Sequence, residues 1–78
     1  MADIERAVHL AARIRARVGV GTTIELVQDG PPGSDLGRGD RGVVREITAD
    51  GCVVVHFERG ISMEIDPDRL PYRRAHAA

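Results

Sequence analysis

The chain has 78 residues, of which 42% are hydrophobic and only two, Phe57 and Tyr72, are aromatic. A chain of this length forms at most one domain with a thin core, so Val, Ile, Leu and Met must fill that core. Eleven Arg, no Lys and twelve acidic residues give a net charge of −1. A single cysteine, Cys52, excludes a disulfide framework or a multi-cysteine metal site and fits a reducing cytoplasm. No run approaches the roughly 20 apolar residues of a membrane span, so we expect no membrane partner.

Residues 3–18 are predicted to form an amphipathic helix, within an N-terminal segment of residues 1–19. Asp3 can cap its start, and Gly19 can end it. Arg15 falls within the apolar stripe of this helix. Its stem could lie along the rest of the protein while its head reaches water, or the stripe could meet an acidic partner. At about 100° per residue the stripe comprises Ile4, Ala7, Val8, Ala11, Ile14 and Val18.

Five strands are predicted to follow, within a domain of residues 20–73 and before a flexible tail of residues 74–78. Val53, Val55 and Phe57 alternate and should point inward together. Ile47 can share the inward face of Val44 only if a β-bulge lies between them. A glycine- and proline-rich loop over 28–40 is long enough to be either functional or mobile. The predicted strands are 22–27, 41–47, 52–57, 61–65 and a short one that begins near Pro71 and Tyr72.

This order of strands, long loop and tight turns resembles an SH3-like barrel over about residues 20–73. The stretch GRGDRGVVREI, with Gly39-Asp40-Arg41-Gly42 before its second strand, is similar to KOW-type barrels and to uncharacterised small bacterial barrel families. The stretches VVVHFERG and IDPDRL also look like small barrel subunits that accompany photosystem and ferredoxin–thioredoxin reductase complexes. The resemblance implies a mainly β fold, a small five-stranded SH3-like barrel that carries an N-terminal amphipathic helix.

No set of residues indicates catalysis. Cys52 and His56 share a strand face but would lie roughly 13 Å apart at about 3.3 Å per residue, too far for a thiolate–imidazole pair. His9, His56 and His76 lack the spacing of a metal site. The glycines of 37–42 come without the Lys and Ser or Thr of a phosphate-binding loop. We therefore expect no enzyme activity of this chain alone, no cofactor and no metal.

Surface recognition is the remaining class of function. The predicted function is a non-catalytic protein-interaction or accessory subunit that binds another protein or a second copy of itself. One alternative is a small barrel subunit of an enzyme complex that is inactive alone. The candidate contact residues are Asp29, Asp35, Arg38, Arg41, Arg45, Val54, His56 and Arg15.

The other alternative is a KOW-type nucleic-acid-binding module. The distribution of charge disfavours it. Residues 1–18 carry four Arg against two acidic residues, whereas residues 19–78 carry seven Arg against ten acidic residues. A nucleic-acid-binding body usually shows a basic excess. If this alternative held, the phosphate contacts would come from Arg38, Arg41, Arg45 and Arg59.

Overall fold

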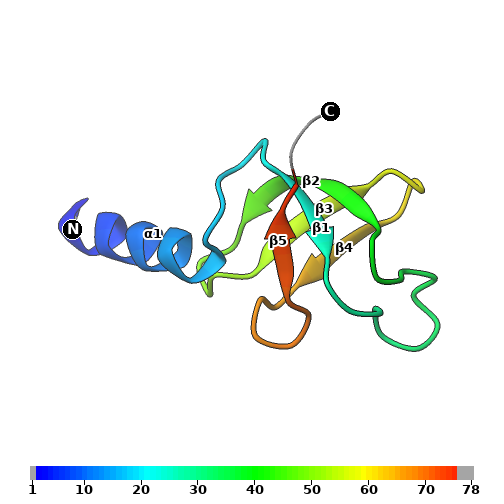
Figure 1. Cartoon of the computed structure of the whole chain (residues 1–78). Helices are drawn as coiled ribbons and strands as arrows, with labels where there is room; N and C mark the ends of the chain where they lie inside the picture. The colour runs from blue at the N-terminus through cyan, green and yellow to red at the C-terminus, as the bar shows by residue number, and fades with distance from the viewer. Residues whose placement is uncertain (1, 76–78) are drawn as a thin grey trace.

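Five antiparallel strands form a single sheet in the computed structural model, which describes residues 2–75 and the side chains of residues 6–75. The strand order is β4-β3-β2-β1-β5, with one helix, α1, before the sheet (Figure 1). The mainly β class with an N-terminal helix is therefore confirmed. The elements are α1 (Ala2–Ala16), β1 (Thr23–Leu26), β2 (Arg41–Ile47), β3 (Val53–Phe57), β4 (Ser62–Ile65) and β5 (Tyr72–Arg74).

The sheet does not close into a barrel, which corrects that part of the prediction. β4 and β5 are its two edges and do not pair with each other. They are only four and three residues long, and the segment that joins them turns without forming a ladder. β4 pairs with β3, and β5 pairs with β1. The other side of each of these short strands has no neighbouring strand in the sheet.

Strand alternation builds the core as predicted. Val53, Val55 and Phe57 are fully buried on one face of β3. The register of β2 against β3 shifts between Val44 and Glu46, so the β-bulge that an inward Ile47 needs is present, and Ile47 packs against the core. Residues from every strand except β5 meet in one buried cluster: Ala16, Val18, Ile24, Leu26, Leu36, Val44, Val53, Val55, Phe57, Ile65 and Leu70.

The loop over 28–40 is anchored rather than open. Leu36 is buried in the core, and its carbonyl oxygen accepts a hydrogen bond of 2.9 Å from the backbone N–H of Gly30. The turn after β4 is held in a similar way. Asp66 Oδ1 accepts from the N–H of Asp68 at 2.9 Å, and Leu70 is buried. Both connections are therefore held by side chains of their own.

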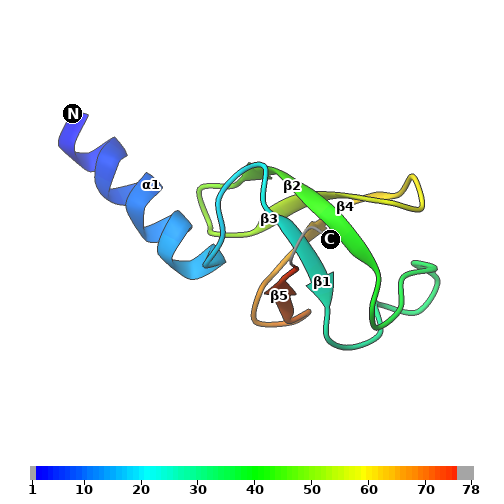
Figure 2. The same cartoon turned by 45° about the horizontal axis from the view of Figure 1, so that its top comes forward.

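Helix α1 ends at Ala16, two residues before the predicted end, and Gly19 is not what ends it. Arg17 reverses the chain with φ of 64°, in the left-handed region. Tyr72 of β5 donates its hydroxyl to the carbonyl oxygen of Ala16 at 2.6 Å, which satisfies one carbonyl that the helix end leaves unpaired. Figure 2 shows α1 projecting away from the sheet, which it meets only near its C-terminal end.

Among its described residues, the predicted apolar stripe reaches the core only at Val18, whereas Val8 in its middle is 42% exposed. The helix buries Ala12 and Ala16 instead, whereas Leu10 and Ile14 are 60% and 67% exposed. The predicted tail also begins too early. Arg74 pairs with Ile24, and the next residue, Ala75, donates to β1 as well, while residues 76–78 lie outside the described part.

Candidate functional site

Two acidic side chains of the long loop, those of Asp29 and Asp40, bond within the protein. Asp29 Oδ1 accepts from the backbone N–H of Arg38 at 3.0 Å. Arg59 donates from Nε to Asp40 Oδ1 at 3.1 Å and from Nη1 to the carbonyl oxygen of Asp35 at 3.2 Å. Asp35 itself takes a left-handed φ of 60°. The predicted contact residues Asp29, Asp35 and Arg38 therefore lie together, and two of them help to fix the shape of the loop.

Arg41 is also engaged within the sheet. Glu25 lies opposite Arg41 of β2 and opposite Arg73 of β5, and its side chain is only 13% exposed. Glu25 Oε1 accepts from Arg41 Nε at 3.0 Å, and Oε2 accepts from Arg73 Nε at 2.8 Å. These two guanidinium groups, Arg41 first, hold the pKa of Glu25 below its usual range. Arg45, by contrast, is exposed and has no ion-pair partner among residues 6–75.

The outer face of β3 carries the other predicted contacts. Val54 is half-buried, and the exposed His56 shares a hydrogen bond of 2.8 Å with Ser62 Oγ through Nδ1. Cys52 instead lies beside Arg15, whose Nη1 is 3.8 Å from the sulfur. Cys52 and His56 thus bond to different partners. Within the described part of the chain, no group of His, Cys, Asp and Glu could hold a metal ion.

Arg15 joins the helix to two turns of the sheet. Its Nη2 lies 2.6 Å from Asp66 Oδ1 and 3.0 Å from Asp68 Oδ2, and its Nη1 donates to the carbonyl oxygen of Asp50 at 2.7 Å. Its stem packs so closely on Gly51 that a Cβ there would lie 2.8 Å from Arg15 Cδ. The stem therefore does lie along the sheet, and the acidic groups that its head meets belong to the same chain.

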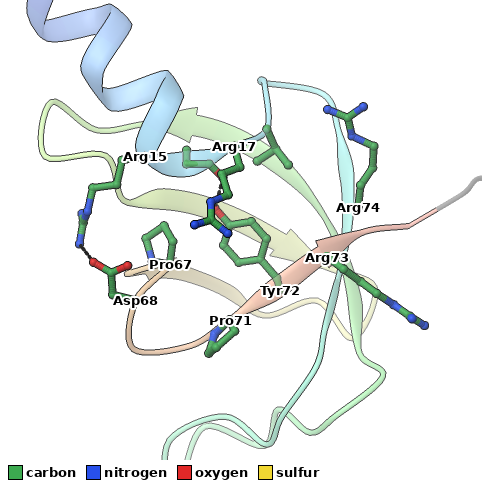
Figure 3. Close-up of a pocket in the computed structure, with 10 residues that line it drawn as sticks. Arg15, Arg17, Pro67, Asp68, Pro71, Tyr72, Arg73 and Arg74 are labelled. Carbon is green, nitrogen blue, oxygen red and sulfur yellow. Dashed lines mark hydrogen bonds and ion pairs between the residues drawn. The ribbon is translucent and has the colours of Figure 1, made fainter.

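A pocket of about 460 Å³ lies between the end of α1 and β5. Figure 3 shows Arg17 and Tyr72 coming together at its centre, with Pro67 and Pro71 beside them. Burial raises the pKa of Tyr72, although nearby Arg17 and Arg15 oppose the shift, so its hydroxyl keeps its proton at neutral pH. Four arginines and one acidic residue line the pocket: Arg15, Arg17, Arg73, Arg74 and Asp68.

Sequence reasoning missed most of this pocket. Of its lining residues, only Arg15 is among the contact residues that the sequence predicts. Arg17 and Tyr72 are 55 positions apart in the sequence, and no motif links them. The one local signal was the pair Arg73-Arg74 directly after Tyr72, which is weak in a chain whose basic residues are all arginine.

The exposed face of α1 is a second candidate surface. Leu10 and Ile14 are four residues apart and therefore share one side of the helix. Both are largely exposed, and so are Ala7, one turn before Leu10, and Ala11. At about 100° per residue Arg6 and Arg13 lie beside Leu10 along one flank of this face. We refer to Ala7, Leu10, Ala11 and Ile14 as the α1 apolar face.

Comparison with protein-family models, with curated proteins and with solved structures finds no match for this chain. The helix of the described part is neither long nor apolar enough to cross a membrane. The pocket and the α1 apolar face are therefore the two candidate functional surfaces.

Proposed function

We propose that this protein is a non-catalytic protein-interaction or accessory subunit that docks through the α1 apolar face. The observation that carries the proposal is the position of α1, which is held at its C-terminal end and exposes Leu10 and Ile14 along its projecting part. Burial of a Leu or Ile side chain is worth about 1.5–3 kcal/mol. A projecting helix that leaves two such side chains in water keeps that free energy available for a partner.

The charges beside this face define the partner. Arg6 and Arg13 make no ion pair among the described residues. Residues 6–16 contain no acidic residue. If two copies of α1 packed antiparallel through this face, Arg6 of one would lie opposite Arg13 of the other, which is repulsive. The partner that fits is therefore an amphipathic helix of another protein, with an apolar stripe flanked by Asp or Glu.

The nucleic-acid alternative has less support. Two of the four arginines that it needs, Arg41 and Arg59, bond to Glu25 and Asp40. A phosphate group would have to compete with those carboxylates. A role as a subunit of an enzyme complex agrees with the proposal, since α1 would then dock on a catalytic partner. Cys52 and His56, the residues with nucleophile and base chemistry, are bonded apart from each other.

The test uses a fluorescent helical peptide with a leucine stripe flanked by glutamates, and a matched peptide with lysines in place of the glutamates. We expect anisotropy to show binding of the first peptide only. The double variant Leu10→Gln, Ile14→Gln should weaken binding at least about tenfold, since lost burial of two side chains exceeds 1.4 kcal/mol. Val27→Gln is the matched control, because Val27 is a partly exposed apolar residue off the helix.

Three outcomes would overturn the proposal. The first is equal binding of both peptides, and the second is an equal loss in Val27→Gln. The third is tighter binding to anionic lipid vesicles than to the acidic peptide, which would make α1 a membrane-surface helix. Heparin retention that falls in Arg41→Gln and Arg45→Gln but survives the double variant would support the nucleic-acid alternative instead.

A further inference from the structure

The pocket beside Tyr72 opens next to an unpaired strand edge. β5 is an edge of the sheet and pairs only with β1. The backbone N–H of Ala75 donates to the carbonyl oxygen of Thr23 at 2.9 Å, and the carbonyl oxygen of Pro71 accepts from the N–H of Val27 at 3.3 Å. The backbone polar groups of residues 71 and 75 therefore face β1. In an antiparallel ladder alternate residues face opposite sides. The backbone N–H and C=O groups of Tyr72 and Arg74 therefore face the open side, toward any strand added there.

Two of the four arginines of the pocket carry unneutralised charge. Arg15 is bonded to Asp66 and Asp68, and Arg73 is bonded to Glu25. Arg17 and Arg74 have no ion-pair partner among residues 6–75. Both line the pocket together with the apolar rings of Pro67 and Pro71. This part of the surface thus combines an excess of positive charge with apolar walls.

The left-handed backbone conformation of Arg17 also indicates a functional role for its side chain. Arg17 holds a φ of 64°, a conformation that glycine adopts freely and residues with a Cβ adopt at a cost. A glycine at this position would suit the end of the helix better. The arginine instead places a guanidinium group in the pocket beside the Tyr72 ring (Figure 3).

We infer that this edge binds an extended acidic peptide, which adds a strand to β5 and places carboxylates against Arg17 and Arg74. An added strand takes its affinity from main-chain hydrogen bonds and its specificity from alternate side chains. Carboxylate–guanidinium pairs are among the strongest hydrogen bonds that proteins make. A phosphate backbone fits less well, because it has no amide groups to pair with the open edge of β5. This site is separate from the α1 apolar face and does not depend on the proposed function.

The probe is a labelled peptide with the sequence Val-Glu-Val-Glu-Val, titrated into the full chain and followed by anisotropy. We expect Arg17→Gly and Arg74→Gln each to weaken peptide binding about tenfold or more, because each variant removes one charge-assisted hydrogen-bonded pair with a peptide carboxylate. Arg17→Gly should melt at the same temperature as the parent or higher, because glycine relieves the left-handed backbone. Arg45→Gln is the matched control, since it removes an exposed unpaired charge elsewhere on the sheet.

Further probes separate the alternatives. The Gln counterpart of the peptide should bind about tenfold more weakly, and a version N-methylated at every residue should not bind, because it cannot donate main-chain hydrogen bonds to β5. Leu10→Gln with Ile14→Gln should leave peptide binding unchanged. The inference is overturned if the Glu peptide does not bind or if Arg45→Gln loses as much as Arg17→Gly. It is also overturned if a single-stranded oligonucleotide binds more tightly than the Glu peptide and loses affinity in the same arginine variants. A further contrary result is that added peptide changes the oligomeric mass of the protein without a peptide–protein complex being formed.

Discussion

The sheet and helix α1 both carry periodic apolar residues, yet only the sheet buries them. Val53, Val55 and Phe57 of β3 have no exposed surface, whereas Leu10 and Ile14 of α1 are more than half exposed. A strand is covered because its neighbours in the ladder and the connections fold over one face. The helix is held to the sheet at its last residue, Ala16, and the part before that residue points away from the sheet. Periodicity therefore identifies an apolar face, but it does not tell what covers that face.

The largest expected effect separates these two apolar faces directly. Val55→Asp would bury an unpaired carboxylate in the core and should cost about 4 kcal/mol or more, a large share of the roughly 5–15 kcal/mol that holds a small domain together. Leu10→Asp places the same charge on an exposed helix face and should change stability by less than about 0.5 kcal/mol. Thermal melting followed by circular dichroism measures both. Similar melting curves for the two variants would contradict the assignment of Val55 to a buried face and Leu10 to an exposed one.

A glycine of β2 offers the next largest effect. A Cβ at Gly42 would lie 2.6 Å from Val55 Cγ1, 2.8 Å from the carbonyl oxygen of His56 and 2.9 Å from Phe57 Cα. Two of these contacts are backbone atoms of β3, which cannot move without opening the ladder. Gly42→Ala should therefore cost about 1–3 kcal/mol, as overpacking does. Urea denaturation gives the difference in unfolding free energy.

The matched control is Gly19→Ala in the connection that follows the helix. A Cβ at Gly19 would meet no atom within 4 Å, and its φ is not in the left-handed region. Its unfolding free energy should stay within about 0.5 kcal/mol of the parent or rise slightly. An equal loss at both positions would mean that the close approach at Gly42 does not matter for stability.

The sheet could be predicted from the sequence more fully than the position of the helix. The sequence predicts β2 at 41–47 and the inward face of β3, because strand alternation is a local pattern, whereas it leaves the bulge of β2 as a condition for an inward Ile47. The left-handed turn at Arg17 could not be predicted, since no local rule favours arginine there. Nor could the pocket, which joins the helix end to Tyr72 across more than fifty positions. The open edges depended on how short β4 and β5 are, and boundaries of short strands are the least visible feature of a sequence.

Tyr72 connects the two regions, and its hydroxyl should contribute a moderate effect. Tyr72→Phe removes the hydrogen bond of 2.6 Å to the carbonyl oxygen of Ala16 but keeps the ring in place. A hydrogen bond of this kind contributes about 0.5–1.5 kcal/mol. We expect a loss of that size in urea denaturation, together with faster amide exchange in the last turn of α1. Faster exchange in β3 instead would show that the bond supports the core rather than the helix.

The smallest expected effect concerns the ion pairs of Glu25, and it tests the sheet through pH. Hydrogen bonds from Arg41 and Arg73 lower the pKa of Glu25 in the folded protein. Its contribution to stability is therefore fully present above the ordinary glutamate pKa and is lost as the pH falls through the lowered folded value. The gap in melting temperature between the parent and Glu25→Gln should shrink between about pH 7 and pH 3. Glu64→Gln, at an exposed position without an ion pair in the described part, should show no comparable narrowing. A gap for Glu25→Gln that widens on acidification would mean that the carboxylate is not stabilised in its charged form.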